Sequence, residues 1–77
     1  MVNKNKIREI IKKSGLEIEP SDEDFEKLFV EIGLDSLDVF GFLSEIEIVL
    51  GNSFSEEDYS KLKTLNDVIS FLNNWFL

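Results

Sequence analysis

Ser36 is the residue best placed to do chemistry, because it stands between two aspartates in the stretch GLDSLDVF, Gly33 to Phe40, where a long apolar pattern begins. It is either an ordinary residue at a helix start or a hydroxyl presented to another molecule. The chain contains no histidine and no cysteine. Serine-histidine and cysteine-histidine catalysis are therefore excluded, and so are disulfides and thiolate metal sites.

Capping preferences place Ser36 at the positive end of a helix. Asp35 is a good N-cap, and Leu34 can pack against Val39 across that cap. A phosphate on the Ser36 hydroxyl would be stabilised by about 0.3–1 kcal/mol at such a helix end, although Asp35 and Asp38 would repel it. The two acids make better sense as contacts for a positively charged protein that visits the site. The alternative is that serine and aspartate simply start helices well.

The charge of the chain is unevenly distributed. Residues 1–13 hold five bases and one acid, a net charge of +4, and the remaining residues hold three bases and fifteen acids, a net charge of −12. Such an anionic body repels nucleic acid and anionic lipid and attracts partners with basic surfaces, although acidity alone commonly serves solubility. Because no long apolar run begins the chain, we expect no signal peptide, no membrane span and a cytoplasmic location.

The element that must position Ser36 belongs to one all-α domain over residues 1–77, a small four-helix bundle with a short third helix. The first helix should end at Ser14, with Gly15 in the left-handed conformation. Residues 16–34 then form a long first loop, which is unusual in so small a domain unless apolar side chains pin it. The predicted pins are Leu28, Phe29 and Ile32.

Three further helices follow the loop. The second should cover residues 36–50, and the third and fourth should begin at Ser55 and Thr64, each with an aspartate three residues later. Phe54 should pack against Tyr59 across the third cap. The residues predicted to face the core in the first, second and fourth helices are Ile7, Ile10, Ile11, Val39, Phe42, Leu43, Ile46, Val49, Leu50, Leu65, Val68, Ile69 and Leu72.

The whole arrangement resembles an acyl carrier protein, and the resemblance covers nearly all of the chain. The family pattern is a glycine shortly before Asp-Ser-Leu, an amphipathic helix, a short acidic helix and a last helix that begins with threonine. Here it reads as Gly33, then Asp35-Ser36-Leu37-Asp38, then SEEDYSKLKTLNDVISFL after Phe54. The resemblance implies that a phosphopantetheinyl transferase attaches a 4'-phosphopantetheine arm from coenzyme A to Ser36, and that the arm's thiol carries acyl groups as thioesters.

The same resemblance implies a freestanding monomer that is not itself an enzyme. Its partners would be acyl-loading and acyl-transferring enzymes with basic docking surfaces. The residues that would form the docking face are Asp35, Leu37, Asp38, Phe40, Gly41, Ser44, Glu47 and Ile48. The candidates for a cavity that shelters the acyl chain, which are equally good as ordinary core, are Phe42, Ile46, Leu62 and Ile69.

Two departures from the family pattern fall on the second helix. Gly41 and Ile48 stand where the family frequently has acids, and together with Leu37 and Ser44 they form an outward seam opposite the core stripe. Gly41 costs the helix about 1 kcal/mol relative to alanine. We interpret the seam as a surface that a partner helix or loop approaches closely. The resemblance as a whole implies a fatty acid, lipid or specialised biosynthetic pathway. The departures argue against the housekeeping carrier of fatty acid synthesis and favour a carrier dedicated to a specialised pathway.

Three alternatives to an acyl carrier follow from the same sequence. A carrier of aminoacyl, peptidyl or polyketide groups needs the same serine. An acidic interaction module of the same fold would never be modified on Ser36. Calcium binding would use Asp22, Glu23 and Asp24, but this run lacks the alternating ligands, central glycine and final glutamate of a calcium loop.

Overall fold

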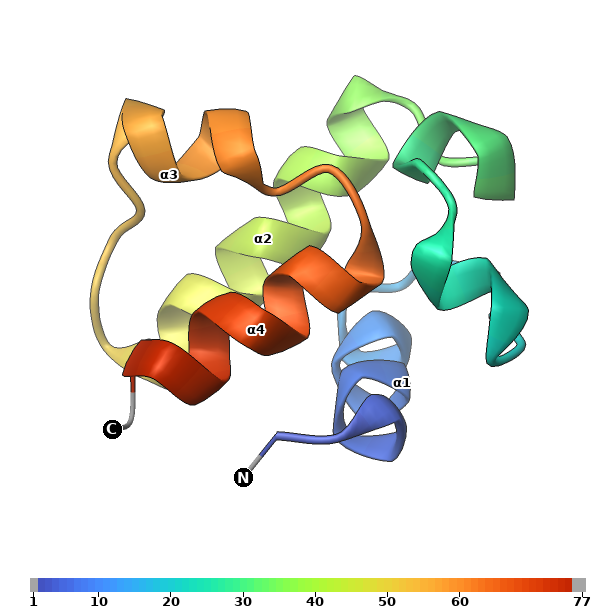
Figure 1. The fold of residues 1–77 in the computed structure, drawn as a ribbon, viewed down its shortest axis with the longest axis horizontal. Helices are drawn as coiled ribbons and strands as arrows, with labels where there is room; N and C mark the ends of the chain where they lie inside the picture. The colour runs from blue at the N-terminus through green and yellow to red at the C-terminus, as the bar shows by residue number, and fades with distance from the viewer. Residues whose placement is uncertain (1, 76–77) are drawn as a thin grey trace.

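Isoleucines spaced three and four residues apart build α1 (Lys4–Lys13), the first helix of a computed structural model that describes residues 2–75 (Figure 1). The Asn3 side chain caps the helix by accepting a hydrogen bond from the Lys6 amide at 2.9 Å. Ile7, Ile10 and Ile11 are buried, and the helix ends at Ser14, both as the sequence predicts.

The long first loop contains two 3₁₀ turns, η1 (Glu23–Glu26) and η2 (Phe29–Ile32). Phe29 is buried as predicted, and Ile32 is half-buried. The prediction for Leu28 is wrong, because its side chain is exposed while its backbone pairs with Thr64 in an isolated bridge. The residue that pins the first half of the loop is instead Phe25, whose side chain is fully buried.

The basic first helix covers this loop. Arg8 and Lys4 lie over the Phe25 ring, at 5.1 Å and 5.5 Å from its centroid. The Arg8 guanidinium also donates to Asp22 at 2.8 Å, and Lys4 lies 3.9 Å from the same carboxylate oxygen. Two of the five bases counted in the sequence are thus engaged in holding η1 against α1.

The longest helix is α2 (Ser36–Leu50), and its buried face consists of Phe42, Leu43 and Ile46. Val39 and Leu50 are half-buried, but Val49, predicted as core, is 51% exposed. Val49 lies in the last turn of α2. Helical periodicity gives the direction of a side chain around the axis, but not how far along the axis neighbouring elements extend to cover it.

Reciprocal caps begin the last two helices, α3 (Glu56–Lys61) and α4 (Leu65–Trp75), as predicted. The Ser55 hydroxyl accepts from the Asp58 amide at 3.1 Å, and the Thr64 hydroxyl accepts from the Asp67 amide at 3.0 Å. In each case the aspartate carboxylate accepts from the cap amide in return. In α4, three of the four predicted core residues are buried and the fourth is half-buried; these are Leu65, Val68, Leu72 and Ile69.

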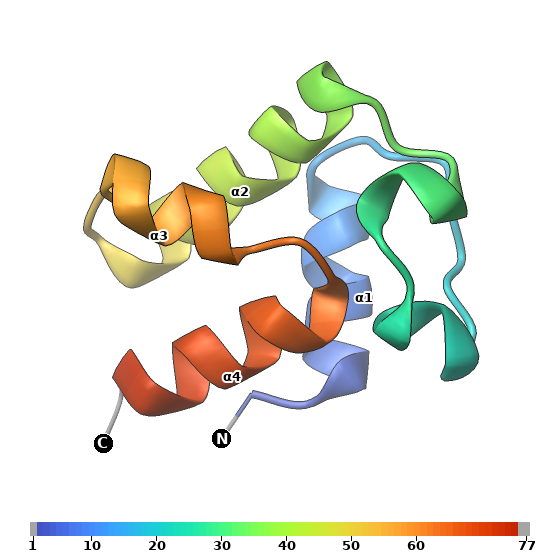
Figure 2. The same ribbon diagram turned by 45° about the horizontal axis from the view of Figure 1, so that its top comes forward.

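Figures 1 and 2 show how these elements frame the start of α2. Helix α1 packs against both α2 and α4, and η1 packs against α4. Helix α3 lies on the opposite side of the bundle from the two 3₁₀ turns. The link from α3 to α4 returns to the turns, where the Phe29 amide donates to the Lys63 carbonyl at 3.1 Å. This bond fixes η2, which leads directly into α2, beside the link between α3 and α4.

Candidate functional site

The turn before α2 directs the backbone so that Ser36 becomes the first residue of this helix. Gly33 ends η2 with φ of 88°, a left-handed conformation that favours glycine, and its amide donates to the Phe29 and Val30 carbonyls. Asp35 then caps α2 by accepting from the Asp38 amide at 2.9 Å, as the sequence predicts.

Asp38 also caps this helix, a role not predicted from the sequence. Its carboxylate accepts a hydrogen bond from the Asp35 amide at 3.1 Å, completing a reciprocal capping box. The sequence does contain the pattern of a reciprocal cap here, because Asp38 follows Asp35 by three residues just as Asp58 follows Ser55. Both aspartates beside Ser36 therefore have a structural function in addition to the charge they present.

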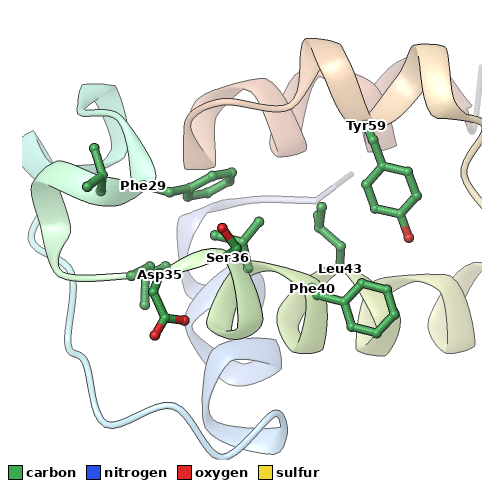
Figure 3. A pocket seen from close by; sticks show the side chains of 9 residues that line it. Phe29, Asp35, Ser36, Phe40, Leu43 and Tyr59 are labelled. Atoms are coloured by element: carbon green, nitrogen blue, oxygen red, sulfur yellow. The ribbon is translucent and has the colours of Figure 1, made fainter.

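The Ser36 side chain is exposed, and none of the residues between 2 and 75 forms a hydrogen bond with its hydroxyl. Figure 3 shows it between Phe29 on one side and the group of Leu43, Phe40 and Tyr59 on the other. At the N-terminus of a fifteen-residue helix, the unpaired amides and the helix dipole favour an attached anionic group such as a phosphodiester. The site therefore fits a phosphate-linked arm on this hydroxyl.

An apolar pocket of about 380 Å³ opens beside Ser36. Its walls come from η2, from the start and second turn of α2, and from α3 (Figure 3). Asp35 is its only charged lining residue, so the pocket suits an apolar group that enters next to the serine. The lining residues are Phe29, Val30, Leu34, Asp35, Ser36, Val39, Phe40, Leu43 and Tyr59.

None of the four cavity candidates named from the sequence lines this pocket. Phe42, Ile46 and Leu62 are buried in the core, and Ile69 is half-buried against it. The helical pattern identifies which residues point inward. It does not show where neighbouring elements leave space between them. The pocket lies where side chains of η2 and α3, which come from opposite sides, reach the first turns of α2.

Glu47, named among the docking residues, has a role inside the chain. Its carboxylate accepts one hydrogen bond from the Phe54 amide at 2.7 Å and another from the Tyr59 hydroxyl at 3.2 Å. Burial, and then the neighbouring Glu47 carboxylate, raise the pKa of the Tyr59 phenol above its ordinary value, so the phenol is even harder to ionise than a free tyrosine.

The outer face of α2 carries several exposed apolar side chains. Leu37 is 79% exposed, Phe40 61% and Ile48 72%, while Gly41 and Ser44 between them are half-buried. A β-carbon added at Gly41 would have no atom within 4 Å, so the packing of the chain does not require a glycine there. Large apolar side chains thus stand on the solvent side of the same helix that presents Ser36.

Residues 2–75 contain neither a metal-binding cluster nor a helix that could span a membrane. No group of three or more acidic side chains there is arranged to hold a metal ion, and this includes Asp22, Glu23 and Asp24. No helix in that range has the length and apolar character needed to cross a bilayer.

Comparison with known proteins assigns the chain to a family. A family model described as a phosphopantetheine attachment site matches residues 4–72, whereas no solved structure matches the chain. Domains of this family hold 4'-phosphopantetheine covalently, interact with the transferase that attaches it and with other partner enzymes, and are typically carriers without catalytic activity. Because the match includes the start of α2, the residues that line the pocket beside it and most of the helical residues, the chain belongs to the phosphopantetheine-attachment family and is a phosphopantetheine-carrying protein similar to acyl carrier proteins.

Proposed function

We propose that Ser36 is the residue that bears the 4'-phosphopantetheine arm, and that the protein carries acyl groups and presents them to partner enzymes. The observation that supports this most directly is the exposed Ser36 hydroxyl, free of hydrogen bonds to residues 2–75, at the N-terminus of α2. When attached, the arm supplies a terminal thiol that holds acyl groups as thioesters. The residues of the chain hold and shelter cargo, and none is assigned a catalytic role.

The lining of the pocket supports an apolar acyl cargo. An aminoacyl group would bring an ammonium ion next to Phe29, Leu43 and Tyr59, where its desolvation would be costly and Asp35 at the rim offers the only opposite charge. An aliphatic or aromatic acyl group has no such cost. This favours a fatty acid, lipid or specialised acyl pathway over an aminoacyl or peptidyl one.

The outer face of α2 supports docking that is partly apolar. Leu37, Phe40 and Ile48 present apolar surface, and the first turns of α2 and α3 add the negative charge of their acids. A partner enzyme with an apolar contact and a basic rim would complement both features. In this proposal the carrier is a cytoplasmic monomer without affinity for nucleic acid, and its partners are acyl-loading and acyl-transferring enzymes.

Intact mass spectrometry tests the assignment of Ser36. After incubation with coenzyme A and a broad-range phosphopantetheinyl transferase, we expect one added arm on the natural chain and none on the Ser36→Ala variant. Ser53→Ala is the matched control, since Ser53 is an exposed serine in the α2–α3 loop. A chain that stays at its unmodified mass would favour an acidic interaction module that is never modified.

A further inference from the structure

Helix α3 has few contacts that could fix its position beside the pocket. It is six residues long and contributes no fully buried side chain. Its own cap, formed by Ser55 and Asp58, starts the helix but does not attach it to the rest of the bundle. A short element with so little buried surface opens easily unless specific bonds hold it.

The bonds that attach α3 to α2 converge on one carboxylate. Glu47 accepts from the Phe54 amide at 2.7 Å, at the entrance to α3, and from the Tyr59 hydroxyl at 3.2 Å, within α3. We call these two hydrogen bonds the Glu47 bridge. Charge-assisted hydrogen bonds of this kind are stronger than neutral ones, and both oxygens of the carboxylate are used.

Tyr59 connects this bridge to the pocket. Its ring is part of the pocket wall beside Leu43, as Figure 3 shows, and it packs edge-to-face on Phe54 with centroids 5.6 Å apart. Phe54 in turn packs on Phe71 of α4 at 5.1 Å. The Tyr59 ring is therefore packed against Phe54 and held at its hydroxyl by Glu47.

We infer that Glu47 is a positioning residue for the cargo: by fixing the Tyr59 ring as a rigid wall, the Glu47 bridge sets the length of acyl chain that the pocket beside Ser36 shelters. The inference rests on the proposed function, since it assumes an acyl chain delivered from Ser36. Breaking the bridge frees the ring and allows α3 to move away from α2, so the pocket accepts longer chains.

The first test uses the unmodified protein. Tyr59 is the only tyrosine in the chain, so an absorbance titration of tyrosinate reports on this phenol alone. We expect Glu47→Gln to lower the pKa of Tyr59 towards its ordinary value, because the negative charge that opposes ionisation is removed. Glu57→Gln is the matched control, since Glu57 is an exposed acid whose ion-pair partner is Lys61 of the same helix. If the pKa of Tyr59 is the same in Glu47→Gln as in the natural chain, Glu47 does not bind the Tyr59 hydroxyl and the inference is wrong.

The second test measures chain length directly. The carrier is loaded with butyryl, hexanoyl, octanoyl, decanoyl and dodecanoyl groups through the transferase and the matching acyl-coenzyme A, and its melting temperature is recorded for each. Because a sheltered chain buries apolar surface, the melting temperature should rise with chain length until the pocket is full. We expect the plateau to occur at a longer acyl chain in Glu47→Gln and in Tyr59→Phe, which keeps the ring but loses the hydroxyl. In Glu57→Gln the plateau should occur at the same acyl chain length as in the natural chain.

The outcomes separate this inference from the proposed function. A chain that never gains mass contradicts the carrier assignment, and the inference with it. A chain that is acylated but reaches its plateau at the same length in all variants, or shows no dependence on length, overturns the role of Glu47 alone. Circular dichroism of each variant confirms that the helices are intact.

Discussion

Asp35 and Asp38 exchange hydrogen bonds across the first turn of α2, each carboxylate accepting from the other residue's amide, at 2.9 and 3.1 Å. Ser36 lies inside this reciprocal cap, and its hydroxyl takes no part in it. Serine is itself a common capping residue, so a cap formed by other side chains leaves the Ser36 hydroxyl available to an external molecule.

Replacing Asp35 separates its capping role from its charge. Asp35→Ala should lower the free energy of unfolding by about 1 kcal/mol, whereas Asp35→Asn should have little effect because asparagine caps as well as aspartate. Urea denaturation measures both. If the charge also contacts a basic transferase, Asp35→Asn should slow arm transfer while leaving stability unchanged. Equal destabilisation by the two variants would contradict the capping role.

Gly41 tests whether the seam on α2 serves docking. Gly41→Ala should raise the free energy of unfolding by about 0.5–1 kcal/mol, because the added methyl meets open space and alanine favours the helix. Gly41→Glu should leave the fold intact yet slow transfer of the arm by the phosphopantetheinyl transferase, measured by intact mass over time. If the arm is transferred to Gly41→Glu at the same rate as to the natural chain, the transferase does not approach α2 closely at this position.

Phe25 and Leu28 can be compared as pins of the first loop. Phe25→Ala should lower the free energy of unfolding by about 3–5 kcal/mol, because it leaves a cavity beneath Arg8 and Lys4. Leu28→Ala should cost about 0.5 kcal/mol or less, since the side chain is exposed and the backbone bridge remains. Denaturant unfolding decides between them, and similar losses for both would show that Leu28 has buried contacts after all.

The ion pairs of Asp22 predict that the stability of the fold depends on pH in the acidic range. A hydrogen bond from the Arg8 guanidinium, and then the charge of Lys4, hold the pKa of Asp22 below its ordinary value. Since the pKa is depressed in the folded state, the stabilisation is present above about pH 4 and is lost as the pH falls through the folded-state value. The melting temperature of the natural chain should thus exceed that of Asp22→Asn at neutral pH, and the difference should vanish in acid.

Salt provides the control for that experiment. The Asp22 side chain is largely exposed, so added salt should reduce the difference at neutral pH as it screens the ion pair. A difference that persists unchanged into strong acid would mean that Asp22→Asn acts through something other than the charge of the carboxylate.

The helices and their ends could be predicted from the sequence because capping is local. Asp35, Ser55 and Thr64 each begin a helix as expected, since the cap and its partner lie within three residues. The first loop could not be predicted in the same way. Whether Phe25 or Leu28 turns inward depends on α1 and on the α3–α4 link, which are distant in sequence.

Long-range contacts also explain what was missed at the site. Glu47 is an acid on a helix, a pattern typical of a solvent-facing or docking residue, but its partners lie seven and twelve residues further along the chain. The pocket likewise requires Phe29 and Tyr59, from two separate elements, to meet beside Ser36. Ser36 itself could be singled out, because its position follows from the cap that precedes it.

Val2 and Asn73 are joined by two hydrogen bonds, one from the Val2 amide at 2.8 Å and one to its carbonyl at 3.2 Å. Figures 1 and 2 place this end of the bundle away from the start of α2. A fluorescent label or a surface anchor attached beside Val2 or Asn73 would therefore leave Ser36 facing the solution. Immobilised carriers of this kind could be screened against a series of candidate enzymes without obstructing the serine.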